Sequence, residues 1–154
     1  MQEKKLAFIK KDLFSLLDNI SDITNANWGK MNAQQMVEHL TAFFNVSTGK
    51  IKFDLLTPEE HLPKYKEFLL SDKPFRENTK APVQVIGEEP LPLEYKSYKE
   101  AVEKLHKAVE HFETYFKNAP GKKTNHPVFG PLNFDEWVLL HYKHVTHHLR
   151  QFGM

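Results

Sequence analysis

The chain has 154 residues with 21 Lys and Arg against 20 Asp and Glu, so its formal net charge is +1 when histidine is neutral. This near balance argues against a dedicated binder of nucleic acid or of anionic membranes, and the length fits one domain over residues 1–154. The chain has no cysteine, which excludes disulfides, thiolate metal ligands and a cysteine nucleophile. Any metal site must therefore use nitrogen or oxygen ligands, and nine histidines are present.

The first half of the chain predicts two amphipathic helices followed by an irregular stretch. Apolar residues recur every three or four positions over Glu3–Ile20, which predicts the first helix. Asn32 is a good N-cap for a second helix, which should end near Gly49. Six prolines between residues 50 and 95 disfavour regular helix there. We expect a long crossover over the surface, with one short helix at Pro58–Leu70.

The second half predicts two further helices. One starts at Ser97 and stops at Pro120-Gly121, and the other starts after an Asn133 N-cap with acidic residues in its first turn. Alternating patterns typical of strands are almost absent. The sequence therefore predicts an all-α fold, a four-helix bundle with a long Pro-rich crossover between its second and third helices.

The N-terminus interleaves charged and apolar residues, and no apolar run is long enough for a secretory signal or a membrane span. We therefore expect a soluble, cytoplasmic protein without a membrane partner.

Several histidines gather on the predicted last helix. His144 and His148 are one turn apart and share a face at the flank of the apolar stripe, so their imidazoles can converge on one ion. His141 lies three residues before His144 and could replace His148 as a ligand, but His141 and His148 cannot readily serve together. His147 is expected to point to solvent on the same side as Lys143.

A metal site on this helix needs a third ligand from another helix. His39 is the best candidate, because it flanks the apolar stripe of the predicted second helix and neighbouring helices can bring such flanks together inside a bundle. The alternative is that these histidines are ordinary residues at helix flanks and bind no metal.

Two short segments resemble the DinB/YfiT-like superfamily of helical-bundle metalloproteins. Residues 28–40 (WGKMNAQQMVEHL) look like its second-helix motif, and residues 144–151 (HVTHHLRQ) look like its last-helix motif. Residues 126–132 are similar to a subgroup whose members mostly lack an assigned activity. The resemblance implies a metal site of His39, His144 and His148. The chain differs where relatives often have an acidic residue, because Val145 stands there.

Three neutral imidazoles would leave a divalent ion such as Zn, Ni or Fe with its Lewis acidity and with open coordination positions. The resemblance implies two chemistries acting on a small molecule. One is S-transfer from a low-molecular-weight thiol such as bacillithiol or mycothiol, and the other is metal-dependent hydrolysis. It also implies a homodimer. The alternatives are a non-catalytic, metal-containing binding or stress-response module, and an interaction domain without metal.

No general base is evident from the sequence. His126, in the loop before the last helix, and Gln151, on the same face as the paired histidines, are the candidate catalytic residues. Glu38 is expected to be a solvated helix carboxylate. Trp28 and Trp137 either line an apolar pocket, together with Phe129, or belong to the ordinary core.

Overall fold

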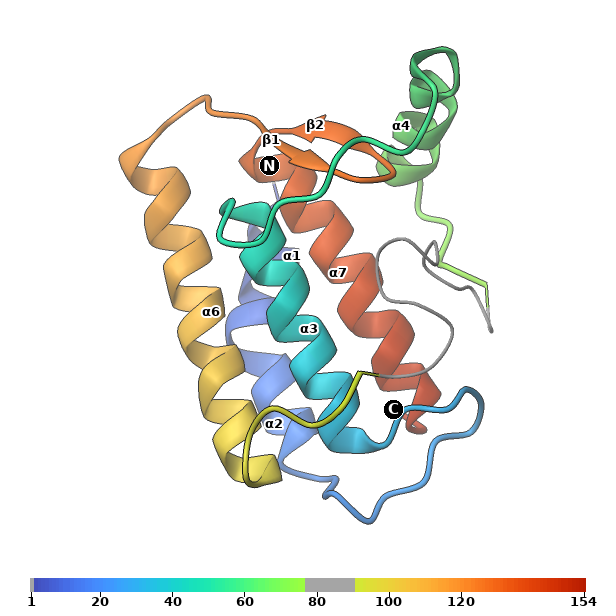
Figure 1. Cartoon of the computed structure of the whole chain (residues 1–154), viewed down its shortest axis with the longest axis vertical. Coiled ribbons are helices and arrows are strands. Elements are labelled where there is room, and N and C mark those ends of the chain that lie inside the picture. Colours follow the sequence, from blue (N-terminus) through green and yellow to red (C-terminus); the bar gives the residue numbers. More distant parts are fainter. Residues whose placement is uncertain (1, 77–90) are drawn as a thin grey trace.

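The computed structural model describes residues 2–76 and 91–154, and within them the chain is mostly helical (Figure 1). The N-terminal helix comprises α1 (Glu3–Ala7), a π-helical turn and α2 (Leu13–Leu17). The long helices of the bundle are α3 (Ala33–Ser47), α6 (Tyr98–Asn118) and α7 (Phe134–Gln151). These elements confirm the predicted helical bundle.

Two smaller elements lie at one end of the bundle. The short helix α4 (Leu62–Leu70) follows a 3-10 turn at Glu59–His61, where the sequence predicts the helix of the crossover. Strands β1 (Thr124–His126) and β2 (Gly130–Leu132) form an antiparallel hairpin just before α7. The hairpin was not predicted, because strands of three residues are too short to show an alternating pattern.

The predicted N-caps are present. Asn32 accepts a hydrogen bond from the Gln35 backbone at 2.8 Å, and the Gln35 side chain accepts from the Asn32 backbone at 2.9 Å. Asn133 and Glu136 form the same reciprocal pair at the start of α7, and Ser97 caps α6. Such caps satisfy backbone donors that have no partner within the helix, so they fix where each helix begins.

Other boundaries differ from the prediction. The first helix ends at Leu17 rather than Ile20, and the π-helical turn at Phe8–Asp12 shifts its phase. The short helix predicted within the crossover is present as α4. The part of the predicted crossover that contains Pro82 and Pro90 lies outside the described residues. Among the helices of residues 2–76 and 91–154, none has both the length and the apolar character needed to cross a membrane.

The core forms where α3 packs along α6 and α7 crosses beside them (Figure 1). Phe44 of α3 meets Phe112 of α6 edge to face, with ring centroids 5.6 Å apart. Leu40 and Val145 are fully buried. Leu40 directly follows His39 and Val145 directly follows His144, so burying these two residues places both histidines at the edge of the core between α3 and α7.

Candidate metal centre

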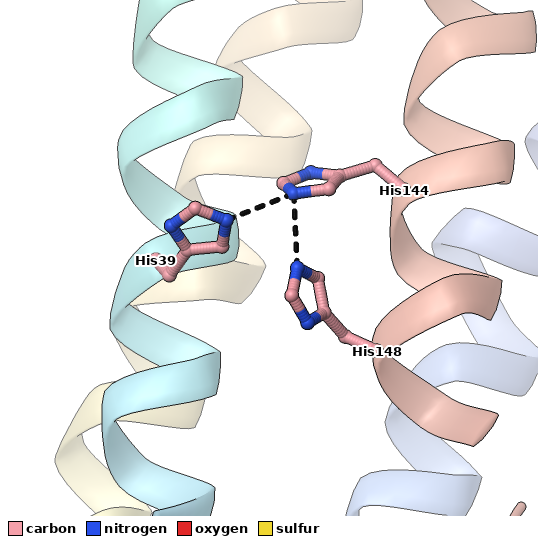
Figure 2. Close-up of side chains that lie close together, drawn as sticks. All are labelled: His39, His144 and His148. Carbon is pink, nitrogen blue, oxygen red and sulfur yellow. Dashed lines mark hydrogen bonds between the residues drawn. The ribbon is translucent and has the colours of Figure 1, made fainter. Parts of the chain in front are cut away.

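Three histidines from two helices point their ring nitrogens toward one place (Figure 2). His39 comes from α3, and His144 and His148 come from α7. The Nε2 atom of His144 lies 2.9 Å from Nε2 of His39 and 3.1 Å from Nε2 of His148. The sequence predicted this set, and the helices bring its members together across 105 residues of chain.

The cluster sits at the edge of the core. His148 is buried, whereas His39 and His144 are half-buried, so the group lies at the boundary between the core and the surface. The i, i+4 spacing of the two histidines on α7 places their rings on one face, and their ring centroids are 4.7 Å apart.

All three imidazoles are held in the neutral form. Burial lowers the pKa of His39 to about 3 and the pKa of His148 to about 4, and neighbouring histidines lower both further. The hydrogen bond with Gln151 partly opposes the effect on His148. Burial also lowers the pKa of His144 well below its usual value, with His148 and His39 adding to the effect. Neutral imidazole is the form that binds a metal.

The donor set fits a divalent transition metal. Imidazole nitrogens suit Zn, Ni and Fe, and two nitrogens bound to a tetrahedral zinc are about 3.3 Å apart. The separations of 2.9 and 3.1 Å from Nε2 of His144 differ from this value by only a few tenths of an ångström, and all three ligand atoms lie within 4.8 Å of one another. Three neutral nitrogens packed together are a poor arrangement for hydrogen bonding alone, because Nε2 of His144 has at most one proton to share with two neighbours.

A second layer of contacts reaches the cluster through Gln151. Its side-chain Oε1 lies 2.9 Å from Nδ1 of His148, and its Nε2 donates to the carbonyl of Trp28 at 2.9 Å. Gln151 was a candidate from the sequence, and in the structure it lies against Nδ1 of His148, a candidate metal ligand. Partners of this kind orient a ligating ring and fix its tautomer.

Phe43 forms one wall of the site. Its ring contacts His39 and His144 edge to face, with centroids 5.0 and 5.1 Å away. The Phe43 ring also neighbours His126, with ring centroids 6.0 Å apart, so Phe43 is close to both His126 and the cluster.

The local geometry of His126 gives it a defined tautomer. Its Nδ1 accepts hydrogen bonds from the backbone of Val128 and of Phe129, at 3.0 and 3.2 Å, which closes the turn of the hairpin. The proton of the neutral ring therefore resides on Nε2. Burial lowers the pKa of His126 to about 3, so the ring is neutral near pH 7. A catalytic role for it stays a prediction.

A comparison of the sequence with known protein families gives the same result as the order of the helices and the histidine cluster. Residues 9–152 match the DinB superfamily. The chain belongs to the DinB superfamily. The resemblance seen in the two histidine motifs is thereby confirmed for nearly the whole chain. No curated protein and no solved structure gives a significant match.

His141 does not join the cluster of this superfamily member. It is buried in the core, where its ring stacks on Phe44 at 3.8 Å and on Trp137 at 5.3 Å. The sequence left His141 open as an alternative to His148. In the structure only His148 of the two has its ring nitrogen beside His144.

The expectation that His147 and Lys143 face solvent was wrong, because both are buried. His147 packs edge to face with Phe75 and Trp28. The Lys143 ammonium donates to the carbonyl of Ser71 just after α4 and also bonds to a second carbonyl in the same turn. The helical repeat of α7 predicted that this face is exposed to solvent. In the structure, α4 and the segment that follows α4 cover the face.

Glu38 is also not the solvated carboxylate that we expected. It accepts hydrogen bonds from the backbone of Glu94 at 2.7 Å and of Tyr95 at 3.3 Å, which ties the end of the crossover to α3. Trp137 is fully buried and donates to the hydroxyl of Thr124 at 2.7 Å, so it belongs to the core rather than to a pocket wall. Backbone partners from a distant segment leave no periodic signal in the sequence.

Proposed function

We propose that this member of the DinB superfamily is a metal-dependent enzyme that transfers a low-molecular-weight thiol to a small electrophile. The observation that carries the proposal is the convergence of three neutral Nε2 atoms from His39, His144 and His148 at one half-buried place. A divalent ion of the Zn, Ni or Fe class bound there would supply Lewis acidity for activating an added thiol or water.

The chemistry of the ligand set favours the thiol. The three ligands bring no negative charge to the site, so an anionic partner such as a thiolate would balance the charge of a divalent ion in surroundings that disfavour an isolated charge. Because the chain contains no cysteine, the thiol must come from a separate small molecule.

The surroundings of the cluster suit an apolar second substrate. Phe43 presents its ring beside both His39 and His144, and these two histidines are half-buried rather than enclosed. An electrophile with an apolar body can lie against this ring with its reactive atom next to the cluster. The chain's own residues therefore hold the ligand nitrogens in place, exclude part of the water and orient the substrate.

The first test is elemental analysis of tag-free protein purified without added metal, with about one equivalent of a transition metal per chain expected. The second is a screen in which the metal-loaded protein receives an apolar electrophile with bacillithiol, mycothiol, coenzyme A or glutathione. Thiol-dependent consumption of the electrophile should occur in the wild type. It should be lost in His148→Ala and kept in His61→Ala, which removes an exposed histidine outside the site.

The outcomes separate the candidate functions. Consumption of ester or amide substrates without any thiol would assign the protein to the hydrolases. A full equivalent of metal without turnover in either screen would favour a non-catalytic binding or stress-response module. Protein that binds no metal under any condition would overturn the proposal.

The homodimer implied by the family resemblance stays a prediction. Sedimentation equilibrium of the metal-loaded protein tests it directly, with a mass of twice 18.1 kDa expected.

A further inference from the structure

The loop before α3 meets the end of α7 close to the histidine cluster. The Asn27 backbone donates to the backbone carbonyl of Gln151 at 2.7 Å, and the Gln151 side chain donates to the Trp28 carbonyl at 2.9 Å. Figure 1 shows this loop, in blue, running past the C-terminal end of α7. Main chain and side chain of one residue are therefore both attached to the same loop.

The attachment decides which way the Gln151 amide faces. A backbone carbonyl only accepts hydrogen bonds, so the group of Gln151 that contacts Trp28 must be the NH₂. The amide oxygen then faces His148, where Oε1 lies 2.9 Å from Nδ1.

The orientation of the amide in turn decides the tautomer of His148. An amide oxygen can only accept, so Nδ1 of His148 must donate its proton to Gln151. In the neutral ring the other nitrogen, Nε2, then has a free lone pair. This is the atom that lies 3.1 Å from Nε2 of His144 inside the cluster.

Gly29 provides the space for this arrangement. Its φ is +82°, a backbone conformation that favours glycine. A Cβ atom at residue 29 would lie 2.4 Å from Nε2 of Gln151 and 3.6 Å from its amide carbon. Any side chain there would displace the amide from the position in which it joins Trp28 to His148.

We propose that Gly29 is a positioning residue for the metal site, because its missing side chain lets the Gln151 amide hold His148 with the lone pair on Nε2. The inference rests on the proposed metal site for its effect on affinity. The tautomer of His148 is a separate consequence that can be measured without any metal. The loop thus acts on His148 through one hydrogen-bonded side chain, that of Gln151.

The experiment compares Gly29→Ala with Gly121→Ala. Gly121 also has a positive φ, +78°, but nothing lies within 4 Å of a Cβ built there. Both variants introduce the same kind of backbone strain, and only Gly29→Ala introduces the collision with Gln151. The zinc dissociation constant is measured by competition with a chelator, and the His148 tautomer is read from imidazole ¹⁵N shifts in metal-free protein.

We expect Gly29→Ala to weaken zinc binding by about 10–100-fold, the usual effect of losing a partner of a metal ligand. The Nδ1–H tautomer of His148 should give way to a mixture. Gly121→Ala should change neither quantity. Equal zinc affinities in the two variants, or an Nε2–H tautomer of His148 in the wild type, would overturn the inference.

Two further variants keep the test decisive if Gly29→Ala folds poorly. Gln151→Met removes the amide without backbone strain, and it should reproduce both effects. In the double variant Gly29→Ala, Gln151→Ala the collision has no target, so adding Gly29→Ala to Gln151→Ala should not weaken zinc binding further. If the wild type bound no zinc, the proposed function would fail, whereas the tautomer measurement would still decide the role of Gly29.

Discussion

The ring of His141 stacks on the ring of Phe44, with centroids 3.8 Å apart and an interplanar angle of 15°. Trp137 covers the ring at 5.3 Å, and within the described residues His141 Nε2 has no hydrogen-bond partner. Burial lowers the pKa of His141 well below its usual value. This histidine therefore acts as an aromatic core residue, although it lies one turn from a candidate metal ligand.

The first prediction follows from this packing. His141→Phe should keep the aromatic contacts and leave metal stoichiometry and affinity unchanged, with a stability change below about 1.5 kcal/mol. Elemental analysis and chelator competition measure the metal, and urea unfolding measures the stability. A loss of metal binding would show that His141 is a ligand and that the assignment of His148 is wrong.

The second prediction concerns the three candidate ligands. His39→Ala, His144→Ala and His148→Ala should each lose most of the metal affinity while far-UV circular dichroism stays close to that of the wild type. His147→Ala is the matched control, since this neighbouring histidine packs against Phe75 and contributes no nitrogen to the cluster. It should lower stability by about 1–3 kcal/mol through lost packing and keep one equivalent of metal. The reverse pattern would contradict the ligand set.

The site was more predictable from the sequence than the surfaces around it. The i, i+4 relation of His144 and His148 depends only on the helical repeat, which is local. The N-caps at Asn32 and Asn133 are local as well, because each acts on a backbone group three residues away. The choice of His39 from another helix rested on its place at the edge of an apolar stripe.

The errors have a common physical cause. His147 and Lys143 were assigned to solvent because their side of α7 is polar in sequence, but α4 lies over that side and gives them partners. Glu38 likewise finds its partners in backbone groups more than fifty residues away. Such contacts depend on where a crossover docks, and a helical wheel of one segment contains no information about that.

The third prediction is the dependence of stability on pH. His126 has a folded pKa of about 3, below its ordinary value of 6.5, so the unfolded chain binds its proton first as the pH falls. The contribution of the neutral His126 ring to the free energy of unfolding is complete above about pH 6.5 and is lost progressively as the pH falls toward 3. One such histidine costs about 2 kcal/mol between pH 7 and pH 5, and His141 adds to the loss. Urea unfolding of metal-free protein across this range should show the decline, and His141→Phe should reduce it. A flat profile would contradict the burial of these rings.

The fourth prediction tests the contact between α4 and α7. The Lys143 ammonium donates to the carbonyls of Ser71 and Lys73 at 2.6 and 2.5 Å, and it lies 4.9 Å from the centre of the Phe68 ring. Lys143→Met keeps the apolar stem and removes the donor, which should cost about 2 kcal/mol. Hydrogen exchange in α4 should become faster, whereas the exposed Lys64→Met should have no such effect. Equal exchange in the two variants would show that the contact is dispensable.

The fifth prediction is the effect of removing the metal. The three Nε2 atoms are brought together only in the folded chain, so a divalent ion that binds them stabilises the fold by mass action. At a free zinc concentration 100 times the dissociation constant, the gain should be about 2.7 kcal/mol. A chelator should lower the melting temperature, and returning zinc should restore it in proportion to the logarithm of its concentration. His148→Ala should melt at the same temperature with and without zinc, because it lacks one of the three nitrogens that the ion joins. A zinc-dependent shift of the same size in that variant would place the binding somewhere other than this cluster.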